Sequence, residues 1–239
     1  MSKTEDLTLK DRIYETILND ILFLRFMPGE KIPEVQIAKE QGVSRPLVHG
    51  AMQRLSWDGL VKLEPNRPPT VIIMDSRMIQ DLAFVRWQHD QLAIPLAIYN
   101  ASARDISELR EVAAQCLQAN SDNDLKQRHI LDAQFHQKIY FLSGNELLYS
   151  LHYRLSLLVR LWQSLHITSS AMLVDGLMQH FQLLDAFERR DTASALEIIQ
   201  KHSSSSFGSD FHGNLLTPND LLHLNVSVKA EGGWTHMRQ

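Results

Sequence analysis

Residues 42–55 of this chain read GVSRPLVHGAMQRL, which has the pattern of a tight turn followed by an amphipathic helix. Gly42 ends the preceding segment. Ser44 stands where an N-cap hydroxyl accepts a hydrogen bond from a free amide of the first helical turn. Apolar residues then recur at helical spacing to about Trp57, and Gly59 breaks the pattern. We therefore predict a helix that begins after Ser44 and ends near Trp57.

Polar side chains lie towards the outer face and the start of this predicted helix. The exposed start of a helix offers backbone amides to a phosphate, and an arginine there can bind the edge of a guanine through two hydrogen bonds. We therefore interpret the helix as a DNA-reading element. Its candidate contacts are Ser44, Arg45, His49, Gln53 and Arg54. The competing interpretation is a solvated face of a helix-turn-helix that contacts only other proteins.

The flanking sequence supplies the rest of a small DNA-binding domain. Upstream, the helical spacing of apolar residues predicts a helix over about 9–24 and a short second helix that ends at Gly42. Downstream, the β-rich runs 60–63 and 70–73 predict a two-stranded hairpin. Three helices followed by a hairpin make a winged helix-turn-helix, in which the hairpin is the wing.

After Asp75 the sequence changes to long helical patterns. Ser102 with Asp105 has the spacing of a capping box, and Gly144 stops one helix before the next begins. The predicted helices cover about 76–101, 104–120, 123–143, 145–167, 170–189 and 191–212. The predicted fold class is mainly α, with an N-terminal winged helix-turn-helix plus a C-terminal antiparallel all-helical bundle. The predicted divisions are a DNA-binding domain over 1–75, a helical domain over 76–212 and a tail over 213–239.

The composition limits the classes of protein that fit. With 44% hydrophobic residues among 239, the chain can bury one sizeable core or two smaller ones. A single cysteine, Cys116, excludes an internal disulfide framework. No apolar run approaches the roughly 18 residues of a membrane span, and the N-terminus has no signal-peptide pattern. We therefore expect a soluble, cytoplasmic protein with no membrane partner.

The net charge of -4 argues against a uniformly basic surface that coats nucleic acid. Basic residues are instead concentrated locally. Residues 43–67 contain four Lys and Arg and two Asp and Glu. The whole segment 1–75 contains ten Lys and Arg and eleven Asp and Glu. This local excess is small, so tight binding needs two copies of the domain on one DNA. We therefore predict a homodimer.

The long helices carry four candidate metal ligands. Asp132 and His136 are four residues apart, so their side chains share one helix face. His180 and His202 lie on the last two predicted helices, towards the bundle interior. Nitrogen and oxygen donors from three helices suit a divalent ion, with zinc as the first candidate and nickel, manganese or iron as the others. The alternative is that each histidine is a hydrogen-bonded core or surface residue.

The N-terminal part resembles the winged-helix domain of the GntR family of bacterial transcription regulators over most of residues 9–73. The matching motifs are Pro28-Gly29-Glu30-Lys31-Ile32, Gly42-Val43-Ser44-Arg45 and Asp58-Gly59-Leu60-Val61. The resemblance implies repression or activation by a homodimer on a short palindromic operator in double-stranded DNA. It also implies base or phosphate contacts by Arg45 and His49, and a wing whose Arg67 approaches the minor groove. The chain departs from the family pattern at Gly50 and at Pro68.

Residues 76–212 resemble the all-helical effector domain, called FCD, of the FadR-type members of that family. The matching motifs are Asp132-x-x-Phe135-His136, Ser143-Gly144-Asn145 and Gln179-His180, with His202 following 22 positions after His180. The resemblance implies that Asp132 and the three histidines bind a metal that helps to hold a small carboxylate effector. Arg86 matches the arginine that pairs with this carboxylate, and Asn145 is a second candidate effector contact.

We predict a metal-dependent, ligand-responsive regulator, a repressor, with no catalytic residues. The alternative is a metal-dependent hydrolase or oxygenase, since an Asp/His site can activate a metal-bound water. That alternative lacks a surplus Glu or Asp at an obvious position for a general base, and it leaves the winged helix unexplained. A protein-interaction adaptor would explain the winged helix but not the four ligands.

Overall fold

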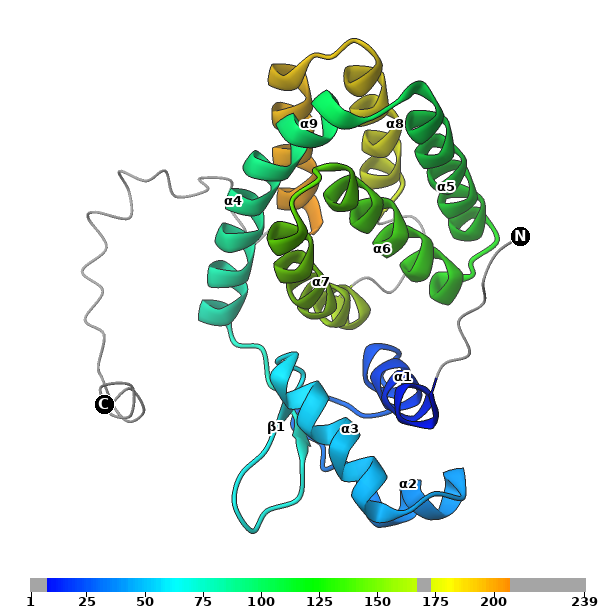
Figure 1. Ribbon diagram of the computed structural model, residues 1–239, viewed down its shortest axis with the longest axis vertical. Coiled ribbons are helices and arrows are strands. Elements are labelled where there is room, and N and C mark those ends of the chain that lie inside the picture. Colours follow the sequence, from blue (N-terminus) through cyan, green and yellow to red (C-terminus); the bar gives the residue numbers. More distant parts are fainter. Residues whose placement is uncertain (1–7, 167–172, 207–239) are drawn as a thin grey trace, which may run out of the picture.

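The computed structural model describes residues 8–166 and 173–206, which form nine α-helices and one two-stranded sheet (Figure 1). The elements gather in two groups, and the smaller group, with the sheet, lies below the larger bundle in Figure 1. This arrangement confirms the predicted fold class. No helix in the described part of the chain combines the length and the apolar character needed to cross a membrane.

The N-terminal group is a winged helix-turn-helix. Its elements are α1 (Leu9–Leu22), α2 (Glu34–Gln41), α3 (Arg45–Trp57), β1 (Val61–Lys62) and β2 (Thr70–Val71). The strands pair antiparallel, with Val61 opposite Val71, and the residues between them form the wing. α2 ends at Gly42, whose φ of 63° is a left-handed conformation that glycine adopts without a steric penalty. This turn separates α2 from α3.

The start of α3 corrects one prediction. Ser44 occupies the N-cap position, but its side chain makes no capping hydrogen bond. Pro46 has no amide to offer such a bond. The amide of Leu47 donates to the backbone carbonyl of Ser44 at 3.1 Å instead. The predicted hairpin is present, although its ladder is two residues long on each side rather than four.

Within the described residues, six helices follow the wing, as predicted. They are α4 (Ser76–Asn100), α5 (Ala103–Ser121), α6 (Leu125–Leu142), α7 (Glu146–His166), α8 (Val174–Glu188) and α9 (Thr192–Ser206). Ser102 and Asp105 form the predicted capping box of α5. Asp191 accepts a hydrogen bond from the amide of Ser194 and so caps α9, also as predicted. The predicted start of α8 at residue 170, the predicted end of α9 at 212 and the tail 213–239 lie outside the described residues.

Helix α7 packs into both groups. Its Leu157 and Leu161 are completely buried in the core of the winged helix-turn-helix, in one cluster with Ile17 and Leu55. The bundle has a separate core built by α4, α5, α6, α8 and α9. Figure 1 shows α7 between these helices and α1, and α7 contacts α1, α4 and α6. The two groups therefore meet along α7.

We expect Leu161→Ala to destabilise the protein, because it removes a completely buried side chain from the core that α7 shares with the winged helix-turn-helix. The unfolding free energy should fall by about 2–5 kcal/mol, measured by urea denaturation. Leu151→Ala is the matched control, since Leu151 is exposed on the same helix. It should change the free energy by less than about 0.5 kcal/mol. Equal losses in the two variants would contradict the packing of α7 on this core.

Candidate functional sites

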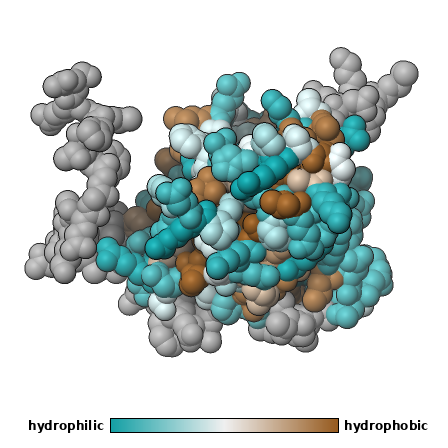
Figure 2. Space-filling view, turned by 90° about the horizontal axis from the view of Figure 1, so that it is seen from below, coloured by the Kyte–Doolittle hydropathy of each residue, from teal (hydrophilic) through white to brown (hydrophobic). Residues whose placement is uncertain are grey.

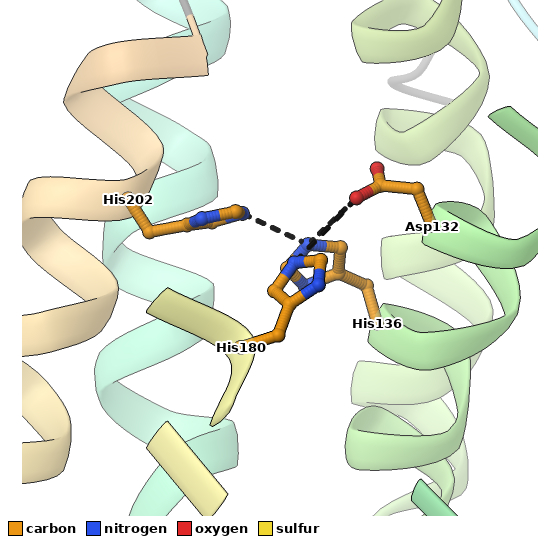
Figure 3. Close-up of side chains that lie close together, drawn as sticks. All are labelled: Asp132, His136, His180 and His202. Carbon is orange, nitrogen blue, oxygen red and sulfur yellow. Dashed lines mark hydrogen bonds and ion pairs between the residues drawn. The ribbon is translucent and has the colours of Figure 1, made fainter. Parts of the chain in front are cut away.

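Four candidate metal ligands converge inside the bundle. Asp132 and His136 come from α6, His180 from α8 and His202 from α9, and Figure 3 shows the four side chains pointing towards one another. Their donor atoms all lie within 4.8 Å of one another. Nε2 of His180 is 3.5 Å from Oδ1 of Asp132, and the Nε2 atoms of His136 and His202 are 3.1 Å apart. Donors around an ion with bonds of about 2.1 Å lie roughly 3–4 Å apart, so the spacing suits a metal.

The surroundings keep the three histidines of the cluster neutral, which is the form that binds a metal. Burial lowers the pKa of His180 and of His202 to about 3. Burial also lowers the pKa of His136 well below its usual value. Both ring nitrogens of His180 lack a hydrogen-bond partner among the described residues, although the side chain is almost completely buried. Buried polar atoms without a partner are costly, and a metal ion would satisfy one of these nitrogens.

Hydrogen bonds behind the cluster orient two of the imidazole rings. Nδ1 of His202 lies 3.2 Å from the backbone carbonyl of Gly176 and donates to it. Nη2 of Arg86 lies 3.3 Å from Nδ1 of His136. In both rings the second nitrogen, Nε2, is left facing the other donors. The contact of His202 is the kind that orients metal-binding histidines in proteins, because the ring donates from the nitrogen that does not face the metal. The guanidinium of Arg86 can only donate, so Nδ1 of His136 accepts and the proton of the neutral ring is on Nε2.

A buried ion pair holds Arg86, and the sequence analysis missed its partner. Nε of Arg86 lies 3.2 Å from Oδ2 of Asp90, one turn further along α4. Asp90 also accepts hydrogen bonds from the hydroxyl of Tyr140 at 2.7 Å and from that of Ser203 at 3.1 Å. The spacing of Arg86 and Asp90 is itself the signal that indicates such a pair on a helix. The sequence therefore contained the information needed to predict Asp90.

A very small cavity of about 10 Å³ adjoins the metal cluster. Arg86, Asp132 and His136 line it, so the predicted effector contact Arg86 lies beside two candidate metal ligands. The α7 side of the cavity consists of His152, Ser156, Val159, Arg160 and Gln163. Asn145, the other predicted effector contact, is not among the lining residues. Its Oδ1 accepts a hydrogen bond from the amide of Leu148 at 3.0 Å and caps α7, so the prediction that Asn145 contacts the effector is not supported.

Several predicted DNA contacts surround a groove of about 1000 Å³ between α2, α3 and the wing. Arg45, His49, Lys39 and Arg67 are among the residues that line it. The carboxylate of Glu34 lies 3.4 Å from Nη2 of Arg45 and 2.8 Å from Nδ1 of His49. Glu34 is largely buried at the start of α2. It therefore holds both candidate contacts in place beside the groove.

Figure 2 views the molecule from the winged-helix side, where the surface is mostly hydrophilic with small hydrophobic patches. Ser44, Gln53 and Arg67 are exposed, as are Arg45 and His49. Exposure of these five side chains is what contact with DNA requires.

Arg54, the remaining predicted DNA contact, lies against α1 rather than along the groove. Its Nη1 donates to Asp11 at 3.0 Å, and its guanidinium stands 3.7 Å from the centre of the Tyr14 ring. These contacts are part of the packing of α3 on α1 and give Arg54 a structural role. The sequence could not show this, because α1 lies more than thirty residues away along the chain.

An exposed reading helix and wing, joined to a separate helical bundle, form the architecture of a DNA-binding transcription regulator. The family model "Bacterial regulatory proteins, gntR family" matches residues 9–71. The model "FCD domain" matches residues 85–205, just over half of the chain. The chain therefore belongs to the GntR family of bacterial regulatory proteins and carries an FCD domain.

Curated relatives and solved structures agree with this membership. The Nta operon transcriptional regulator of Aminobacter aminovorans is 28% identical over 186 residues, which cover 74% of this chain and 84% of that protein. The transcriptional regulator McbR of Escherichia coli (strain K12) is 26% identical over 168 residues, which cover 69% of this chain and 75% of that protein. The solved structure of E. coli McbR/YncC has a TM-score of 0.73 at 20% identity and covers 82% of this chain and 94% of its own. The structure of a GntR regulator from Rhodococcus sp. RHA1 has a TM-score of 0.72 at 20% identity, and the match covers 83% of this chain and 95% of that one. These two structures show the same fold.

We expect the purified protein to contain about one equivalent of a divalent metal by elemental analysis, and the double variant His180→Ala, His202→Ala to contain less than about a tenth of that. The reason is that two of the four converging donors are lost. The matched control is the double variant His49→Ala, His166→Ala, which removes two exposed histidines outside the cluster. A full equivalent of metal in the cluster variant would refute the ligand assignment.

Proposed function

We propose that this regulator is a metal-dependent, ligand-responsive repressor that binds a short palindromic operator as a homodimer. One observation supports this proposal above the others. A buried cluster of one carboxylate and three neutral histidines, with a cavity beside it, occurs in the same chain as an exposed reading helix. A regulator controlled by a ligand needs both sites. A hydrolase needs only the first, and an adaptor needs only the second.

The cluster would hold a divalent ion through one oxygen of Asp132 and one nitrogen each of His136, His180 and His202. Zinc suits this donor set, and so do nickel, manganese and iron. When bound, the ion supplies positive charge and an open coordination position for an oxygen of the ligand. The histidines contribute neutral donors because burial lowers their pKa values.

The effector class that the lining of the cavity favours is a small carboxylic acid. Arg86 lines the cavity, and a guanidinium binds a carboxylate through two parallel hydrogen bonds. Asp90 holds the Nε side of Arg86, and Nη2 of the guanidinium lies on the side of the cluster, 3.3 Å from Nδ1 of His136. At about 10 Å³ the cavity has room for one water-sized group, so binding of a carboxylic acid would require the side chains that line it to move apart.

The operator would be read by the groove side of α3. Arg45 lies at the first position of that helix, where its side chain can bind a guanine edge, and Glu34 orients it. The wing carries Arg67, which adds phosphate or minor-groove contact. Each copy of the domain provides only a small positive excess, so a homodimer on a palindrome would double the contacts.

We expect Arg45→Ala to lose about tenfold or more in operator affinity, because one bidentate base contact is worth roughly 1–3 kcal/mol. The measurement is fluorescence anisotropy with duplex DNA selected from a random library by the full-length protein. Arg104→Ala is the matched control, since it removes the same charge from an exposed site on α5. Equal affinity of wild type and Arg45→Ala would show that α3 does not read the operator in the proposed way.

We expect at least one of lactate, succinate and citrate to change the operator affinity of the metal-loaded protein by about 5- to 150-fold, the usual range of allosteric coupling. Arg86→Ala should abolish this change, because the carboxylate loses its guanidinium partner. Removal of the metal with a chelator should abolish it too. A full response in Arg86→Ala would place the effector elsewhere.

A further inference from the structure

The exposed face of helix α3 has two edges. Arg45 and His49 lie along one edge and line the groove beside the wing. Pro46, Gly50 and Arg54 follow one another at four-residue spacing along the other edge. This second edge lines another concave surface, the α1/α3 hollow, where α1 packs on α3 (Figure 1). The residues of both edges are exposed, so both edges are accessible to DNA.

Gly50 lies in the middle of α3, where the fold itself does not require a glycine. Glycine is a poor helix former, and only proline is worse. The described glycines with a left-handed φ are Gly29, Gly42, Gly59 and Gly144, so Gly50 has an ordinary helical backbone. A Cβ at position 50 would meet no described atom within 4 Å. A glycine that the fold does not need indicates a place where the backbone approaches a ligand closely.

The α1/α3 hollow has room for part of another molecule. Its volume is about 420 Å³, whereas one water in the liquid occupies about 30 Å³. Lys10, Pro46 and Gly50, which line it, are all exposed, so the hollow opens to solvent. A side chain at position 50 would occupy part of this space. Position 50 therefore controls how closely an occupant of the hollow can approach α3.

The rim of the hollow favours an anionic group. Lys10 and Arg54 each carry a positive charge there and Asp11 carries one negative charge, so the net charge of the lining is +1. Helix α1 begins at Leu9, next to Lys10, and the start of a helix adds partial positive charge. DNA phosphates are anions that basic side chains and helix starts bind.

The dimensions of DNA connect this hollow to the reading of an operator. The major groove is about 12 Å wide, and a helix with its side chains is about 10–12 Å across. Both strands therefore pass close to a helix that reads bases in the groove. When Arg45 reaches a base from one edge of α3, a strand passes the other edge, at Gly50 and the α1/α3 hollow.

We propose that the sugar–phosphate backbone of one operator strand enters the α1/α3 hollow and packs directly on the backbone of α3 at Gly50. Lys10 binds a phosphate of this strand at the rim. The missing side chain lets α3 lie deep in the major groove, so Gly50 determines whether Arg45 reaches its base. This inference rests on the proposed reading of the operator by α3 and adds a second set of DNA contacts to it.

The first test enlarges position 50 without weakening the helix. Gly50→Ala and Gly50→Gln both introduce a better helix former. Operator affinity is measured by fluorescence anisotropy on the full-length protein, with duplex DNA selected from a random library by the wild type. Gly50→Gln should lose about tenfold or more in affinity, and Gly50→Ala should lose less, because the longer side chain keeps the strand further from α3. Ala114→Gln is the matched control, since it adds a side chain at an exposed position of α5 and should leave the affinity unchanged.

The second test concerns the strand in the hollow. Lys10→Gln removes one phosphate contact, so the slope of log affinity against log salt concentration should fall in magnitude by about 0.9. Lys201→Gln, at an exposed position of α9, is the control and should leave the slope unchanged. The thermal unfolding midpoints of the Gly50 variants should be no lower than that of the wild type, which separates a loss of affinity from a loss of folding.

The outcomes distinguish this inference from the proposed function, because Arg45→Ala is measured in parallel. Wild-type affinity in Gly50→Gln, together with a loss in Arg45→Ala, overturns the inference alone. An unchanged salt slope in Lys10→Gln, or an equal loss in Ala114→Gln and Gly50→Gln, also overturns it. Wild-type affinity in Arg45→Ala refutes the reading of the operator by α3, and the inference about Gly50 falls with it.

Discussion

Helix α7 is buried on two sides, and most of the functional arrangement follows from that constraint. Leu157 and Leu161 fill the core of the winged helix-turn-helix, and His152 is completely enclosed on the bundle side. Arg154 strengthens the junction, because it donates to the backbone carbonyl of Trp57 and lies over the Trp57 ring. Packed interiors transmit displacement rather than absorb it. A shift of α7 at the cavity therefore also moves the surface on which α1 and α3 rest.

The polar interior of the bundle contains two kinds of group. Asp90 accepts hydrogen bonds from Arg86, Tyr140 and Ser203, so its charge is satisfied and the side chains around it are held in place. His180 and His152 are also buried but have no hydrogen-bond partners in the part of the chain that the structure describes. Fully satisfied networks are rigid, whereas unsatisfied groups cost stability unless another species completes them. The first kind positions the site, and the second kind indicates where the metal and the ligand would bind.

The fold could be predicted from local signals in the sequence, and the metal cluster from helix faces. The glycine turn before α3, the capping box of α5 and the apolar stripes that bring His180 and His202 together all act within a few turns of one helix. The polar residues of α7 that line the cavity, His152, Arg160 and Gln163, could not be predicted in that way. Arg160 and Gln163 stand opposite an apolar stripe, where polar residues usually face water. Only the packing of α7 between two groups of helices buries them.

A similar tertiary effect explains Arg54. On α3 it follows Gln53 and belongs to the polar side of the helix, so local patterning does not separate it from the candidate DNA contacts. The partners that draw it away, Asp11 and Tyr14, are on α1.

The packing of α7 between the two groups of helices determines how a ligand can act on DNA binding. A ligand shifts the equilibrium between the DNA-binding arrangement of a regulator and the arrangement that does not bind DNA only if its affinities for the two differ. A ligand that bound His152 and Gln163 would stabilise the position of α7 in which their polar atoms converge. One or two hydrogen bonds, at about 0.5–1.5 kcal/mol each, match the roughly 1–3 kcal/mol of typical allosteric coupling. Because α7 also forms part of the winged-helix core, that free energy of ligand binding would act on the placement of the reading helix itself.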